Sequence, residues 1–240
     1  MLCETQRPET FSDIIGHEEP KRILEEYLTK KPYTGSVFLT GTAGIGKTTL
    51  ALASTRMFGF EPLEINASKS MRSFQDVERL RESCRSSFSI QSFIRNTKQT
   101  LCIILDEVDG SDPHAQRRII DWVKDETRTV PIICTGNDIP AIFKRNADVI
   151  NIVRCYAPKS TDIQSLFPTS NVQLIIKECQ HDIRRIIHRI QYGESYVFPK
   201  YSIPPTGLCV EESFTARQKM FQLPDPLAHR NDILDTERSS

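Results

Sequence analysis

Short apolar runs alternate with amphipathic segments along the first two thirds of the chain. The apolar runs are brief and end at polar or glycine residues, so they predict buried strands. They lie at residues 36–40, 61–66, 101–105, 130–135 and 149–153. Apolar residues at helical spacing predict helices at 20–30, 48–57, 72–98 (broken near 86–92) and 113–125. Strands that are apolar on both faces and alternate with helices indicate an α/β fold, with a parallel sheet covered by helices on both faces.

The strand pattern stops after Ala157-Pro158. Residues 159–192 carry only helical patterns, and the segment from 196 on holds five prolines with one short helical pattern at 214–221. We therefore expect three parts. They are an α/β core at 1–157, a small all-helical domain at 158–195, and an extended or partly ordered C-terminal tail at 196–240.

Composition excludes several classes of protein. The 240 residues include 31 Lys+Arg and 31 Asp+Glu, so the net charge is zero and any polyanion must bind at a local patch. No apolar run approaches the ~18 residues of a membrane span, and the N-terminus has no secretory signal pattern. The seven cysteines form no CxxC pair, which favours reduced thiols in a cytosolic or nuclear protein.

A glycine-rich segment lies between the first predicted strand and the next helix. Gly41–Thr48 fits the pattern G-x-x-x-x-G-K-[ST], in which glycines let backbone amides curl around phosphate oxygens. Lys47 can reach the β- and γ-phosphates, and the Thr48 hydroxyl can bind Mg²⁺. The alternative is a glycine-rich turn with a solvated lysine. The residues expected to hold the nucleotide are Gly41, Thr42, Ala43, Gly44, Ile45, Gly46, Lys47, Thr48 and Thr49.

Polar residues follow two later strands. Asp106 and Glu107 end the most apolar strand, at the edge of the sheet where ligands bind in open α/β folds. We expect Asp106 to join the Mg²⁺ shell and Glu107 to act as a general base on water. Asn137 is expected beside Glu107, where its amide can hold a γ-phosphate and the attacking water. The alternatives are a solvated corner for the two acids and an ordinary turn for Asn137.

Arg184 opens the last strong helical pattern, near the stripe of Ile187 and Ile190. We expect it at the start of a face that packs inward, from which its guanidinium can clamp the γ-phosphate. The alternative is a surface arginine near a helix start.

Several motifs together resemble the AAA+ ATPases and, within them, the clamp-loader family. Three of them, near Asp106, Pro131 and Ser213, resemble its eukaryotic large subunit. The similar segments are Arg7-Pro8 with Phe11–Gly16, Glu64–Ser68, Asp106–Gly110, Pro131–Cys134 and Ser213–Phe221. The resemblance implies that Arg7, Pro8, Ile14 and Ile15 line an adenine pocket, that 1–157 is the nucleotide-binding core, and that the helical domain is its lid.

The resemblance also implies a function. Family members use ATP and Mg²⁺ to load a ring-shaped sliding clamp onto primer–template DNA, as one subunit of a pentamer with small clamp-loader subunits. It implies the nucleus as location, with the cytoplasm as the alternative. The alternatives for function are another AAA+ loader (for a checkpoint clamp or a helicase), an ATP-binding scaffold without turnover, and a small-molecule kinase.

The sequence departs from the family pattern at several places. Thr5 and Gln6 replace a usual Lys-Tyr, and Phe143–Ala147 does not match the Ser-Arg-Cys finger that small subunits supply to a neighbour. ATP turnover is therefore expected to be slow without partners. The lid is short, and a collar domain and a long N-terminal extension are absent, so we expect a minimal version or a fragment.

Basic residues suggest where DNA would lie. The segment from Lys69 to Lys98 contains seven basic residues and three acidic ones. Lys69 and Arg72 follow the Glu64–Ser68 motif, and Arg117-Arg118 forms a second basic pair. Contacts of this kind would be sequence-independent and salt-sensitive, and the alternative is a solvated helical face.

Overall fold

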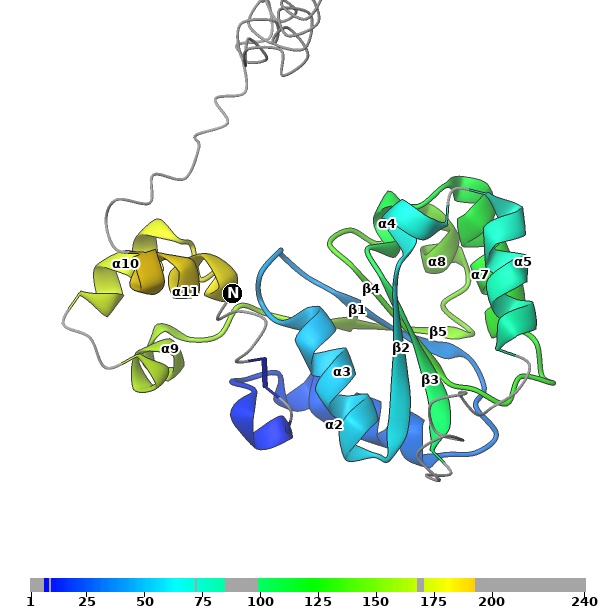
Figure 1. Ribbon diagram of the computed structural model, residues 1–240, viewed down its shortest axis with the longest axis horizontal. Coiled ribbons are helices and arrows are strands. Elements are labelled where there is room, and N and C mark those ends of the chain that lie inside the picture. The colour runs from blue at the N-terminus through cyan, green and yellow to red at the C-terminus, as the bar shows by residue number, and fades with distance from the viewer. Residues whose placement is uncertain (1–6, 9, 72, 85–98, 168–170, 193–240) are drawn as a thin grey trace, which may run out of the picture. The chain divides into compact units, whose positions relative to one another are not determined.

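A computed structural model describes residues 7–8, 10–71, 73–84, 99–167 and 171–192 (Figure 1). Its centre is a parallel five-stranded sheet in the order β2-β3-β4-β1-β5. The strands are β1 (Ser36–Thr40), β2 (Phe60–Asn66), β3 (Thr100–Asp106), β4 (Ile132–Gly136) and β5 (Ile150–Arg154). The parallel sheet predicted from the apolar runs is therefore confirmed.

Helices cover both faces of the sheet, as Figure 1 shows. One face carries α2 (Glu18–Thr29) and α3 (Lys47–Met57), which bury Leu24, Leu28 and Leu50 against the sheet. The other face carries α5 (Phe74–Ser83), α7 (Pro113–Val123) and α8 (Ala141–Arg145). Short helical turns lie at α4 (Ala67–Ser70), Phe11–Asp13 and Val108–Gly110.

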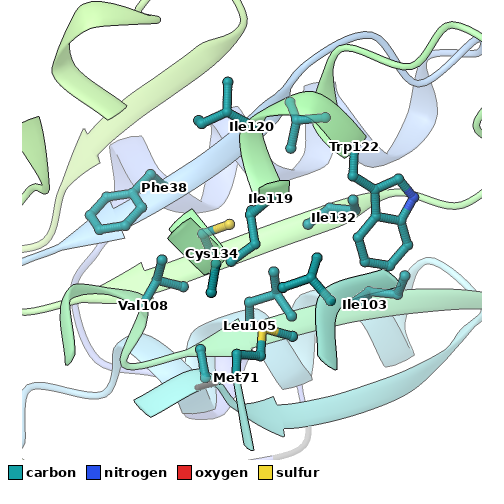
Figure 2. Packing of buried hydrophobic residues seen from close by; sticks show 14 of the residues in the cluster. Phe38, Met71, Ile103, Leu105, Val108, Ile119, Ile120, Trp122, Ile132 and Cys134 are labelled. Atoms are coloured by element: carbon teal, nitrogen blue, oxygen red, sulfur yellow. The ribbon is translucent and has the colours of Figure 1, made fainter. Parts of the chain in front are cut away.

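The central strand β3 explains why its sequence is apolar without alternation. Leu101, Ile103 and Leu105 point into the cluster under α5 and α7, while Cys102 and Ile104 point into the cluster under α2 and α3. Figure 2 shows the first cluster, where Ile103 and Leu105 lie near Trp122 and Met71. A strand that is buried on both faces has no solvent-facing side, so polar and apolar residues do not alternate along it.

Element ends differ from the predicted ones by up to two residues in the core. β4 begins at Ile132 rather than at 130, and α7 ends at Val123 rather than at 125. Only part of the long helical pattern predicted at 72–98 falls on described residues. Its first piece is α5, which begins with a capping box between Ser73 and Asp76, and residues 85–98 lie outside the described ones.

The segment after β5 is helical wherever it is described. It contains α9 (Ser160–Leu166), α10 (Val172–Glu178) and α11 (Ile183–Tyr192). All described residues belong to one compact unit, Met1–Tyr196. The predicted domain boundary at 157 stays a prediction, and the predicted tail with its helix at 214–221 lies outside the described residues. None of the described helices is both long enough and apolar enough to cross a membrane.

Candidate nucleotide-binding site

The glycine-rich segment forms a loop between the end of β1 and the start of α3. Gly46 adopts φ +98° at the N-cap of α3, a conformation that favours glycine. The helix begins at Lys47, so its free amide groups and its positive dipole end point toward the loop. The local structure is that of an anion-binding loop.

Lys47 is nearly buried at the base of this loop, with 8% of its surface exposed. Its Nζ donates to the carbonyl oxygens of Gly41 (2.9 Å) and Thr42 (2.8 Å) and to Oδ1 of Asn137 (3.0 Å). Burial lowers the pKa of Lys47, and the nearby Asp106 raises it. The ammonium group therefore lies where a phosphate would meet the loop.

A second group of polar atoms comes from the ends of β3 and β4. The Thr48 hydroxyl donates to Oδ1 of Asp106 over 2.9 Å, and Thr135 donates to the same oxygen. The two residues predicted to bind Mg²⁺ are thus adjacent, although they are far apart in the sequence. A carboxylate beside a hydroxyl is a donor set that suits Mg²⁺, so these residues fit the ion.

Glu107 follows Asp106 but faces other partners. Its backbone is left-handed, with φ +55° and ψ +44°, which is uncommon for a residue with a side chain. Oε2 accepts hydrogen bonds from Nδ2 of Asn66 (2.9 Å) and Oγ of Ser68 (2.8 Å). These two bonds lower the pKa of Glu107, so it is an ionised carboxylate at neutral pH.

Asn137 was expected beside Glu107, but the hydrogen bonds described for it are made with other residues on both sides of β4. Besides accepting from Lys47, its backbone N–H donates to Oδ2 of Asp109 over 3.0 Å, and its carbonyl accepts from Thr40 (3.0 Å). The reason is the strand order, because β4 lies between β3 and β1. Asn137 therefore connects the lysine of the loop to the acidic segment after β3.

Arg184 lies in the first turn of α11 and is exposed. The buried residue of α11 is Ile186, so the stripe through Arg184 does not pack into the core as predicted. It lines a cavity instead, together with Ile183 and Ile187. Its positive charge lowers the pKa of both Lys47 and Glu107, which places it near both halves of the site.

A cavity of about 720 Å³ is lined by residues of the loop, of the N-terminal segment and of α9 and α11, whereas Asp106, Glu107 and Asn137 are not among its lining residues. This volume is within the usual range for a pocket that holds a small ligand, roughly 300–1,000 Å³. The four residues predicted to line an adenine pocket all lie in its wall, as do residues 44–49 of the loop. The four are Arg7, Pro8, Ile14 and Ile15.

The family comparison agrees with this geometry. Residues 37–154 match the family model described as "ATPase family associated with various cellular activities (AAA)". Residues 37–154 are thus similar to an AAA domain. The sheet, the loop and the acidic strand end all lie within the matched range, so the predicted fold class is confirmed.

Curated relatives match more than half of the chain. A replication factor C large subunit from Sulfurisphaera tokodaii is 38% identical over 138 residues, which are 55% of this chain and 30% of that protein. One from Methanococcus aeolicus is 37% identical over 161 residues, or 63% of this chain and 32% of that protein. The chain therefore matches about a third of the length of these relatives.

Solved structures support the fold. The Holliday junction branch migration motor RuvB from Thermotoga maritima superposes with a TM-score of 0.57 at 15% identity, covering 77% of this chain and 64% of that one. At this identity the similarity concerns the fold of the AAA domain alone.

The residues proposed for DNA contact are placed differently from one another. Lys69 on α4 and Arg117 on α7 are exposed. Arg118 instead donates from Nε to Oε2 of Glu78 on α5 over 2.7 Å, so its charge is compensated between two helices. Arg72 lies outside the described residues. The exposed pair is thus better placed for a phosphate backbone than Arg118, and DNA contact stays a prediction for all four.

Sequence reasoning missed several residues of the site. Asn66 and Ser68 were noticed only as part of a family-like segment, and Thr135 was not singled out as a hydrogen-bond donor. A usable signal exists for Asn66, because it ends a strand just as Asp106 does and is its register partner in the sheet. Finding it requires knowing that β2 and β3 are neighbours.

Proposed function

We propose that this protein is an ATP-dependent clamp-loader subunit of the replication factor C large-subunit type. It would bind ATP with Mg²⁺ in the cavity of its AAA domain and help to load a sliding clamp onto primer–template DNA, together with small clamp-loader subunits in a pentamer. The support comes from the relatives called replication factor C large subunit and from the arrangement of the site. The family and the fold neighbours support an ATPase, while a slow turnover rate is our further proposal.

One observation carries the nucleotide part of the proposal. The Thr48 hydroxyl and the Asp106 carboxylate meet at 2.9 Å, on the same edge of the sheet as the buried ammonium group of Lys47. Strand-end carboxylates next to an anion-binding loop are the arrangement that a metal-bound triphosphate requires. The bound Mg²⁺ would supply charge neutralisation at the phosphates.

Each side chain then has a role in the proposal. Lys47 and the loop amides bind phosphate oxygens, and Arg184 adds a guanidinium that can clamp them from α11. Asp106 and Thr48 orient the metal. Glu107, which is ionised, accepts the proton of the attacking water, and Asn137 orients that water from beside Lys47.

The roles of Lys47 and Glu107 can be tested separately. Lys47→Ala is expected to abolish binding of a fluorescent ATP analogue, because it removes the ammonium group at the loop. Glu107→Gln is expected to bind the analogue as well as the wild type does but to lose hydrolysis by roughly 10²–10⁴-fold, the usual contribution of a general base. Binding is measured by anisotropy and hydrolysis by phosphate release.

Arg56→Ala is the matched control, because it removes an exposed positive charge from the far end of the same helix. It should leave both measurements unchanged. Normal hydrolysis by Glu107→Gln would show that the assigned base is wrong. Retention of sliding clamp, but not of replicative helicase, by the tagged protein separates clamp loading from the alternative of a helicase loader.

A further inference from the structure

The first helix turn of α11 lies directly against the phosphate-binding loop. The backbone N–H of Ile183 donates to the carbonyl oxygen of Gly44 over 3.0 Å. This bond joins the middle of the loop to the start of the helix that carries Arg184. Loop and helix are therefore connected directly through backbone atoms.

The Asp182 side chain fills the space beside Gly44. A Cβ atom built on Gly44 would lie 1.9 Å from Oδ1 of Asp182, so no larger residue fits while the carboxylate stays in place. Gly44 also has φ +74°, which favours glycine independently. The lack of a side chain at this position thus serves the contact with α11 as well as the curl of the loop.

The Asp182 carboxylate is not free to move aside. Its Oδ1 accepts a hydrogen bond from the backbone N–H of Arg185 over 3.0 Å, the bond that an N-cap residue makes. Two residues with left-handed backbone, Gln180 (φ +51°) and His181 (φ +61°), precede it. His181 is bonded in turn to Ser160 on α9 at 3.0 Å. The turn before α11 is thus fixed on both sides of Asp182.

We propose that Asp182 is a positioning residue, which seats the start of α11 on Gly44 and thereby places Arg184 at the phosphate end of the cavity. The proposal rests on the proposed ATP-binding function and adds a residue to it. Arg184 follows Asp182 by two positions, so a guanidinium that must reach a γ-phosphate depends on where the carboxylate holds the helix. Loop and helical segment then respond together to the nucleotide.

The contact itself is tested without nucleotide, by a double-mutant cycle. Gly44→Ala should lower the urea midpoint of unfolding, and it should lower the midpoint less in an Asp182→Ala background, because the side chain that blocks the new methyl group is gone. If the two substitutions have additive effects, Asp182 does not restrict Gly44 and the proposal is wrong.

The positioning role is tested by the preference for ATP over ADP. Asp182→Ser keeps a capping oxygen but is too short to fill the space at Gly44, so it should reduce the ratio of ATP to ADP affinity. Arg184→Ala should reduce it to a similar extent, roughly tenfold for the loss of a charge-assisted hydrogen bond. The double variant Asp182→Ser/Arg184→Ala should lower the ratio no further than Arg184→Ala alone. Asp182→Asn, which keeps both the size and the capping oxygen, should preserve the ratio.

Asp112→Ala provides the matched control for a lost helix cap. Asp112 caps α7 by accepting from the His114 N–H over 2.7 Å, so its removal should lower stability without changing the ATP-to-ADP ratio. An unchanged ratio in Asp182→Ser would overturn the positioning role. If instead Lys47→Ala binds ATP as well as the wild type does, the proposed nucleotide site itself is wrong, which distinguishes the two failures.

Discussion

Two neighbouring carboxylates of the AAA domain face different surroundings. Asp106 receives the hydroxyl groups of Thr48 and Thr135, while the left-handed backbone at Glu107 turns the next side chain toward Asn66 and Ser68. A single unusual residue conformation therefore separates the residue proposed to bind the metal from the residue proposed to accept a proton. It also allows two neutral donors to lower the pKa of Glu107.

Removing these donors should raise the pKa of Glu107. In Asn66→Ala/Ser68→Ala the carboxylate loses two hydrogen bonds to its charged form, so the pKa should return toward the ordinary value of a glutamic acid. The pKa is measured by NMR titration of the labelled side-chain carboxyl group, with Ser70→Ala, an exposed neighbour on α4, as control.

The same change predicts a pH effect on stability. Because folding lowers the pKa of Glu107, its contribution is present above the pKa of the unfolded chain and is lost as the pH falls through the folded value. The unfolding free energy of the double variant should depend less on pH in the acidic range than that of the wild type. If the pKa of Glu107 in the double variant equalled that of the wild type, the bonds from Asn66 and Ser68 would not be what lowers it.

At the scale of residues, the sequence indicated which side chains form the site better than it indicated their hydrogen-bond partners. Lys47, Thr48 and Asp106 were expected together because a loop and a strand end meet at one edge of a parallel sheet. The partners of Glu107 and Asn137 could not be predicted, because they depend on which strands are neighbours and on one backbone conformation. Local patterns in the sequence determine neither.

At the scale of the elements, β3 is the strand whose five central residues, Leu101–Leu105, are all buried. Its side chains enter the clusters on both faces, and Ile103 is fully buried beneath Trp122 (Figure 2). A strand of this kind couples the two layers of helices, so a cavity beside it affects the whole core.

Truncation at Ile103 should be strongly destabilising. Ile103→Ala is expected to lower the free energy of unfolding by about 2–5 kcal/mol and Ile103→Val by about 0.5–1.5 kcal/mol. The larger truncation costs more because it removes more buried atoms and leaves a larger cavity. Urea unfolding measures both. The control Leu174→Ala removes a side chain that is 64% exposed and should change the free energy by about 0.5 kcal/mol or less. Equal effects of the buried and exposed changes would contradict the described core.

The strands were predicted almost fully because burial on both faces leaves a short apolar run that few other structures produce. The short helices α4 and α8 were not predicted. A helix of four or five residues has too few positions to show a period, and α8 is fixed by tertiary packing of Phe143 on Phe38, with ring centroids 5.3 Å apart. Such packing cannot be read from neighbouring residues.

Across the whole molecule, the site collects side chains from four strand ends and one helix of the later helical segment. The segment Phe143–Ala147, whose first three residues end α8, does not match the finger that small subunits supply to a neighbouring site. An AAA domain whose transition-state arginine comes from a partner turns over slowly by itself.

We therefore expect low ATP hydrolysis by the isolated chain and a large increase on addition of small clamp-loader subunits. An arginine supplied by a partner contributes roughly 10³–10⁵ in rate. Phosphate release is measured with and without these subunits, and Glu107→Gln serves as the control that should stay inactive in both cases. Fast hydrolysis by the chain alone would contradict dependence on a partner.

The position of β4 in the sheet has a consequence for the dimensions of the site. The phosphate-binding loop follows β1 and the acidic pair follows β3, and these strands do not touch because β4 pairs with both. Two strand spacings of about 4.8 Å therefore separate the backbones of β1 and β3 by roughly 10 Å, and the Thr48 side chain at the start of α3 reaches across this gap to Asp106. That width is a property of the backbone ladder rather than of any ligand-binding side chain. If β4 shifted along β1 and β3, Thr135 and Asn137 would move together. Asp106 and Lys47 would then both lose a hydrogen-bond partner.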